Sequence, residues 1–237
     1  MEKKIEFKSG KNILRGSLFV PKGKGPFPGV IFFHGSESDR QGALPICEVL
    51  SSKGFMCLAF DFSGHGESDD KFKNLTHRQV SNDGQAALDF IYKQHVDKSR
   101  IGLRGSSMGG YVAASLLLKY DIKSLLLNVP AAYGYPDEKM VDLDAKGGNK
   151  YLNDRKNWIN SETYEGIRKF KGSLLVMRNE FDEILSKDMV ETYFKEANNA
   201  KVKKLYVLKG AKHSTHDNPK AKEKQRKMTI DWFLKTL

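Results

Sequence analysis

The pentapeptide Gly105-Ser106-Ser107-Met108-Gly109 constrains the fold of this chain more than any other stretch. The short, largely apolar run at residues 100–104 predicts a buried strand, and residues 111–118, rich in Ala and Leu and free of Pro, predict a helix. Glycines two residues before and two after Ser107 let strand and helix approach closely and leave the Ser107 hydroxyl raised on the bend. The arrangement is typical of a nucleophile elbow. A Gly/Ser-rich connecting turn has the same composition, so the serine needs partners elsewhere in the chain.

The rest of the chain alternates apolar strands with helical patterns. We expect strands at residues 4–7, 13–20, 29–33, 54–60, 123–129, 173–177 and 204–208, and helices at residues 40–52, 76–95, 187–198 and 222–234. The first two strands form a hairpin. Alternation of this kind predicts an α/β protein with a doubly wound, mostly parallel β-sheet and helices on both faces, in which functional groups collect at the carboxyl ends of the strands.

Length and composition limit the number of domains and the classes of partner that this chain can have. A chain of 237 residues with 39% apolar content predicts a single domain over residues 1–237. The two cysteines, Cys47 and Cys57, suggest neither a disulfide framework nor a thiolate metal site, and no His/Cys/Asp/Glu cluster has metal-ligand spacing. The first residues lack an apolar signal region and no apolar run is long enough to span a bilayer, so we expect a cytoplasmic location and no membrane partner. The net charge of +11 comes from scattered lysines, which favours a solvated basic surface over a nucleic-acid site.

The predicted strand ends supply partners for Ser107. A serine hydroxyl needs a general base within hydrogen-bond reach and a third group that orients that base. His213 follows the last predicted strand and is the preferred base; His216 is its rival. We expect His77 and His95, on a predicted helix, to face solvent.

Asp182 follows the strand at residues 173–177 and is the preferred acid, with Glu180 and Glu183 as alternatives in the same loop. The chain order Ser107, Asp182, His213 differs from that of the trypsin-like and subtilisin-like enzymes. Asp83 is expected to make a helix or loop hydrogen bond rather than to act as a catalytic acid.

On these motifs, together with His34-Gly35 and the loop at residues 61–68, the chain resembles the α/β-hydrolase superfamily and is similar to its small esterase and acylglycerol-lipase-like branch. The resemblance runs over essentially the whole chain. It implies acyl transfer to water through an acyl-serine, with no metal and no organic cofactor.

The resemblance also implies two backbone donors for the oxyanion, the N–H groups of Met108 and Ser36, each worth about 3 kcal/mol. Ser36 stands where many relatives carry a bulky apolar residue. His34 is expected to shape this oxyanion loop through a structural hydrogen bond, and His65 to serve a tight turn in a structural loop.

The irregular residues 130–171 correspond, by the same resemblance, to a short lid insertion. Tyr133 and Trp158 are among its aromatic residues and are candidate substrate contacts, although the aromatic rings could equally form the lid's own small core. A short lid favours small or aromatic esters over long lipid chains.

The sequence therefore predicts a serine esterase that cleaves carboxylic esters of small or aromatic acids. A peptidase or a thioesterase of the same fold is the nearest alternative, and a non-catalytic ligand-binding relative is the alternative from another class. The expected partner is a small-molecule ester; a homodimer is left open.

Overall fold

The computed structural model describes residues 1–135, 137 and 148–237. It contains one eight-stranded sheet in the order β1-β2-β4-β3-β5-β6-β7-β8. The first three strands of this order pair antiparallel, and all the pairs from β4 to β8 are parallel. The strands are β1 (Glu2–Ser9), β2 (Asn12–Phe19), β3 (Phe27–Phe33), β4 (Met56–Phe60), β5 (Val96–Ser106), β6 (Ser124–Asn128), β7 (Ser173–Phe181) and β8 (Val202–Lys212).

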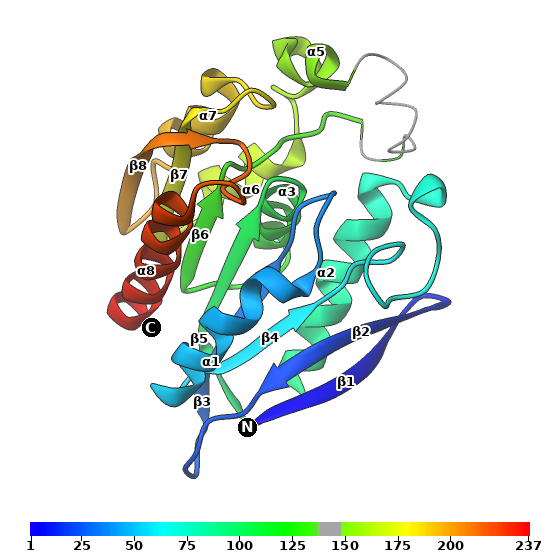
Figure 1. Ribbon diagram of the computed structural model, residues 1–237, viewed down its shortest axis with the longest axis vertical. Helices are drawn as coiled ribbons and strands as arrows, with labels where there is room; N and C mark the ends of the chain where they lie inside the picture. The colour runs from blue at the N-terminus through cyan, green and yellow to red at the C-terminus, as the bar shows by residue number, and fades with distance from the viewer. Residues whose placement is uncertain (136, 138–147) are drawn as a thin grey trace.

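Helices cover both faces of this sheet (Figure 1). Buried side chains of α1 and α8 pack on one face, and those of α2, α3, α6 and α7 pack on the other. The α-helices are α1 (Leu44–Ser52), α2 (His77–Tyr92), α3 (Met108–Ser115), α5 (Gly148–Asn153), α6 (Glu162–Lys169), α7 (Lys187–Glu196) and α8 (Pro219–Thr236). The predicted doubly wound α/β class is thus confirmed.

The elements follow the order that the sequence predicts, with bounds that differ by several residues, and the difference near Arg40 has a clear cause. The predicted helix at residues 40–52 is a 3-10 turn (Arg40–Ala43) followed by α1. Pro45 occupies the first turn of α1, where its missing N–H costs no hydrogen bond, so the α-helix begins there rather than at Arg40. Thr76, Ser186 and Asn218 cap the N-termini of α2, α7 and α8 through their side chains.

The predicted lid, residues 130–171, lies partly outside the described residues. Its described part contains α5, a 3-10 turn (Arg155–Asn157) and α6. Tyr164 of α6 donates a hydrogen bond to the Met189 carbonyl of α7 (3.1 Å), and its ring lies 4.8 Å from that of Tyr193. This part of the segment is therefore anchored on the main body of the fold.

The expectation that His77 faces solvent is wrong. Its side chain is 2% exposed, and its ring stacks on Tyr133 with a centroid distance of 3.4 Å. Helical periodicity missed this because the residue lies at the first turn of α2, where the chain returning from β6 covers it. His95 is exposed, as expected, and its Nε2 lies 2.8 Å from the Lys24 carbonyl oxygen.

Burial of His77 leads to a prediction about acid stability. Burial lowers the pKa of His77 to about 3, so the folded state keeps the imidazole neutral while the unfolded chain binds a proton below about pH 6.5. Between these values the unfolded state holds more protons, and stability falls as pH falls, by up to about 1.4 kcal/mol per pH unit. His77→Phe keeps a ring for Tyr133 and removes the buried, unpartnered Nδ1. Between pH 7 and pH 5 we expect the free energy of unfolding to fall by about 2 kcal/mol less in this variant than in the wild type.

Thermal unfolding of both proteins at the two pH values measures this difference. His216→Asn is the matched control, because that imidazole is 84% exposed. An unchanged acid response in His77→Phe would contradict the prediction.

Candidate active site

Ser107 lies at the junction of β5 and α3, at the carboxyl edge of the parallel strands. Its backbone has φ 51° and ψ −117°, a conformation that side-chain-bearing residues rarely adopt. Hydrogen bonds hold it there: its N–H donates to the Asn128 carbonyl of β6 (3.0 Å), and its own carbonyl accepts from Gly110 (2.8 Å) and Ala131 (3.0 Å). This backbone geometry agrees with the elbow that the sequence predicts.

The flanking glycines permit this turn. A Cβ on Gly105 would lie under 3.0 Å from the Gly109 carbonyl oxygen, and a Cβ on Gly109 would lie as close to the Phe33 carbonyl at the end of β3. Strand, elbow and helix therefore touch through their backbones at these two positions.

The structure brings Ser107, His213 and Asp182 into one hydrogen-bonded line. His213 Nε2 lies 3.1 Å from Ser107 Oγ, and His213 Nδ1 lies 2.9 Å from each carboxylate oxygen of Asp182. The carboxylate also accepts the backbone N–H groups of Ile184 (3.0 Å) and Leu185 (2.9 Å), which fix its orientation. These are the contacts that a serine nucleophile, a histidine base and an orienting acid require.

The alternatives that the sequence offers to His213 and Asp182 make other contacts. His216 is exposed and its Nδ1 contacts the neighbouring Asp217 (2.9 Å). Glu180 binds Lys209 and the Gly210 N–H, and Glu183 accepts the backbone N–H of His213 (3.0 Å) rather than a ring proton. Asp83 is buried in α2 and accepts the Ser63 N–H (2.8 Å), as the sequence predicts for a structural carboxylate.

Met108 and Ser36 lie where backbone donors could face a charge developing near Ser107. Met108 is the first residue of α3, and the N–H groups of a first helical turn have no intrahelical acceptor. Gly35 lies against Ser107, since a Cβ on this glycine would be 3.5 Å from the Ser107 Cβ. The loop that carries Ser36 therefore runs directly beside the serine.

His34 holds the peptide group that carries the Ser36 N–H. Its Nε2 accepts the Phe62 N–H (3.0 Å), so its Nδ1 carries the proton and donates to the Gly35 carbonyl (2.7 Å). That carbonyl and the Ser36 N–H belong to one planar trans peptide and point in opposite directions. Burial lowers the pKa of His34 to about 3, which keeps the ring neutral and preserves this bonding pattern.

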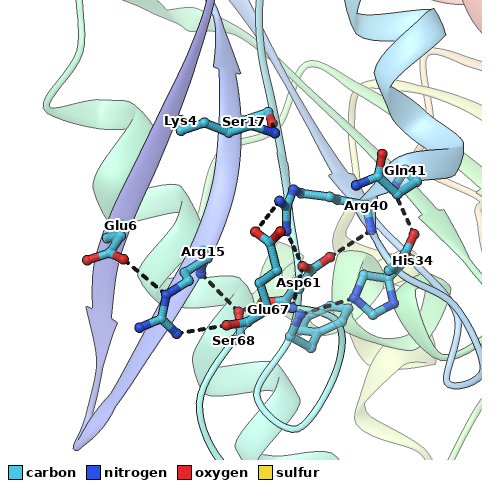
Figure 2. A network of polar contacts seen from close by, with 12 residues as sticks. Lys4, Glu6, Arg15, Ser17, His34, Arg40, Gln41, Asp61, Glu67 and Ser68 are labelled. Carbon is cyan, nitrogen blue, oxygen red and sulfur yellow. Dashed lines mark hydrogen bonds and ion pairs between the residues drawn. The ribbon is translucent and has the colours of Figure 1, made fainter.

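The loop after β4 supports the Ser36 loop from the other side, a role that the sequence did not reveal. His65 Nε2 lies 2.7 Å from the Ser36 carbonyl oxygen. Figure 2 shows Arg40 reaching both Asp61 and Glu67, and Asp61 Oδ1 also accepts the Arg40 N–H (2.8 Å). A buried ion pair thus ties the segment after β3 to the segment after β4. The loop at residues 61–68 can be recognised in the sequence as a structural loop, but the sequence does not indicate that Arg40 pairs with Asp61.

Tyr133 and Trp158 both lie in the hydrophobic core. Tyr133 packs between His77 and Tyr111, and Trp158 is 1% exposed and packs against Tyr164. In this conformation the Trp158 ring is covered by protein. Substrate contact by these two residues stays a prediction.

The described residues hold no group of three or more His, Cys, Asp or Glu side chains arranged for a metal ion. Cys47 and Cys57 are buried free thiols. Across residues 1–135, 137 and 148–237, every helix is too short or too polar to cross a bilayer.

Comparison with known proteins places the chain in a family. A family model described as serine aminopeptidase, S33, matches residues 26–151, which is more than half of the chain. The fold and this match define an α/β-hydrolase. The chain belongs to the serine aminopeptidase S33 family.

Relatives in this superfamily include enzymes of several kinds. Esterase EstD of Thermotoga maritima is 29% identical over 129 residues, covering 51% of this chain and 31% of EstD. Est1E from Butyrivibrio proteoclasticus, whose structure has ferulic acid bound, shares the fold with a TM-score of 0.76 at 21% identity and 98% coverage of both chains. An acylaminoacyl peptidase of Pyrococcus horikoshii gives a TM-score of 0.78 at 19% identity, covering all of this chain and 42% of that one. The matched part of this chain spans less than half the length of the first curated relatives.

Proposed function

We propose that this protein is a serine esterase that cleaves carboxylic esters of small or aromatic acids through an acyl-serine intermediate. The observation that carries the proposal is the placement of His213, whose two ring nitrogens contact Ser107 Oγ and the Asp182 carboxylate. His213 and Asp182 come from different loops. The acid contacts the histidine and the histidine contacts the serine hydroxyl, as acyl transfer requires.

The proposed reaction begins with attack of Ser107 Oγ on the ester carbonyl carbon while His213 Nε2 takes the hydroxyl proton. The carbonyl π electrons move to oxygen, and the N–H groups of Met108 and Ser36 donate hydrogen bonds to this oxyanion. Collapse breaks the bond to the alcohol oxygen, which leaves with the proton from His213. Water then attacks the acyl-serine by the same proton path and releases the acid and Ser107.

The peptidase alternative is favoured by the description of the matching family model. The two activities share the nucleophile and differ in the leaving group that His213 must protonate. Hydrolysis of p-nitrophenyl butyrate and of a panel of amino acid and N-acylamino acid p-nitroanilides under the same conditions separates them. A larger kcat/KM for the anilides would replace the esterase proposal by a peptidase.

The test of the proposal itself is the reaction of the wild type with a fluorophosphonate probe, read by intact mass, beside turnover of the butyrate ester. One adduct, mapped to Ser107, together with turnover supports it. A folded protein with neither adduct nor turnover would favour a non-catalytic ligand-binding role.

The short segment at residues 130–171 leads to a prediction about acyl chain length. Three of its aromatic residues, Tyr133, Trp158 and Tyr164, pack into the core, and Tyr135 is the exposed aromatic residue among those that the structure describes in this segment. Little aromatic surface is therefore left to cover a long chain. We expect kcat/KM for p-nitrophenyl acetate or butyrate to exceed that for the palmitate ester by at least about 10-fold, in detergent-matched assays. Comparable values for short and long esters would contradict the preference for small acids.

A further inference from the structure

β8, the strand that His213 follows, departs from regular pairing with β7 near its carboxyl end. β7 and β8 pair residue by residue from Ser173 opposite Val202 to Asn179 opposite Leu208. The next pair joins Phe181 to Lys212, so two steps along β7 correspond to four along β8. An irregularity of this kind re-aims the strand and leaves backbone groups without their ladder partners.

Side chains take the place of the missing ladder partners. Glu180 accepts the Gly210 N–H (2.9 Å) and the Lys209 ammonium (2.8 Å), and Asn218 donates to the Gly210 carbonyl (3.1 Å). Gly210 has φ +68°, a value that favours glycine. These contacts hold the irregular segment in one shape.

Asn179 holds the chain on either side of the Lys212–His213 peptide bond. Its side chain is fully buried, and its Nδ2 donates to the Lys212 carbonyl (2.6 Å) and contacts the His213 carbonyl (3.2 Å). Because both partners are acceptors, the amide nitrogen must face them. β7 thus contacts the backbone of the base directly, in addition to the contact between Asp182 and the ring.

Glu183 holds the opposite side of the same residue. Its Oε2 accepts the His213 backbone N–H at 3.0 Å. Both backbone polar groups of His213 are therefore engaged by side chains that flank Asp182 in sequence, Asn179 on one side and Glu183 on the other. A shift of this backbone would carry the imidazole away from Ser107 even if its contact with Asp182 persisted.

We infer that Asn179 and Glu183 are positioning residues for the base: they hold the His213 backbone so that its ring spans Asp182 and Ser107. The inference rests on the proposed esterase function for its kinetic consequences. It assigns no proton transfer to either residue, since neither contacts a ring nitrogen of His213.

The test uses Glu183, which is exposed and can be altered without opening the core. Glu183→Ala removes the acceptor and is expected to lower kcat for p-nitrophenyl butyrate about 5- to 20-fold, with KM changed less than 2-fold. Glu183→Gln keeps an acceptor oxygen at the same reach and is expected to restore most of kcat. Glu165→Ala is the matched control, an exposed glutamate whose hydrogen bond to Lys169 (2.6 Å) lies within α6. Asn179→Ala is expected to lower kcat further, with its fold checked by thermal unfolding.

A second readout separates this inference from the proposed function. The His213 Nδ1 proton, shared with Asp182, gives a downfield proton resonance when the ring is held. We expect that resonance in the wild type and in Glu183→Gln, and expect it broadened or absent in Glu183→Ala. If the wild type shows no esterase activity the proposed function fails, and the resonance alone decides the positioning role. Wild-type kcat and an intact resonance in Glu183→Ala would overturn the inference, as would absence of the resonance from the wild type.

Discussion

Replacing Ser107 with alanine is expected to lower kcat for p-nitrophenyl ester hydrolysis by at least about 10⁴-fold while the protein stays folded. The hydroxyl oxygen is the atom that forms the acyl bond in the proposed reaction, and alanine removes only that oxygen. His213 would then face a methyl group, and the remaining backbone donors could stabilise attack by water only weakly. Initial rates with butyrate and acetate esters measure the loss, and intact mass after the fluorophosphonate probe should show no adduct.

The neighbouring serine provides the control for this variant. Ser106 Oγ accepts a hydrogen bond from the Asn128 side chain (2.9 Å), and no contact to His213 is found for it in the described residues. Ser106→Ala should stay within a few-fold of wild-type kcat and should still take up one adduct. Equal losses in the two variants would show that the elbow was disturbed as a whole, and full activity in Ser107→Ala would remove this serine from the mechanism.

Replacing Asp61 with alanine is expected to cost about 3–5 kcal/mol of unfolding free energy, the largest stability effect expected here. The side chains of Arg40 and Asp61 are each 1% exposed, so loss of the carboxylate leaves a buried guanidinium whose remaining ionic partner, among the residues that the structure describes, is Glu67. The change also removes acceptors for the backbone N–H groups of Arg40 (2.8 Å) and Glu67 (3.0 Å). In a chain of this length the midpoint of thermal unfolding should fall by roughly 10 °C.

An exposed ion pair in the same region calibrates the measurement. Glu6 and Arg15 form an ion pair between neighbouring strands (Figure 2). Their charged atoms lie 3.0 Å apart, and the glutamate side chain is 63% exposed. Glu6→Ala should change stability by less than about 1 kcal/mol, because exposed pairs are screened by water. If Asp61→Ala lowered the free energy of unfolding by no more than this control, the contribution assigned to the buried ion pair would be wrong.

Ser107, Asp182 and His213 could be singled out from the sequence because each directly follows a strand. The apolar runs at residues 100–104, 173–177 and 204–208 mark three strands of one parallel sheet, and polar residues at their carboxyl ends meet at one edge. The strands prove longer than these runs, since β7 extends to Phe181 and β8 to Lys212. The added residues are mixed in polarity, so periodicity could not predict them.

Contacts between loops could not be predicted from the sequence. Arg40 pairs with Asp61, and Asn179 and Glu183 contact the backbone of His213. Each contact joins two segments that are distant in the chain, and hydrophobic periodicity reports only on local structure. By sequence Glu183 is an alternative to Asp182 as the acid, but its carboxylate accepts a backbone N–H. A residue type can suggest a role, but the partner depends on how two loops are placed by the strands below them.

The position of β8 at the border of the sheet has a consequence for how the proposed activity would be lost under stress. His213, the proposed base, is separated from Ser107 by 106 residues and follows a strand that pairs with β7 at the border of the sheet. Outer strands detach in local opening events that cost less free energy than unfolding of the whole domain. Heat or denaturant should therefore disconnect His213 while the central strands remain paired, so that inactivation precedes cooperative melting and is reversible as long as the core survives.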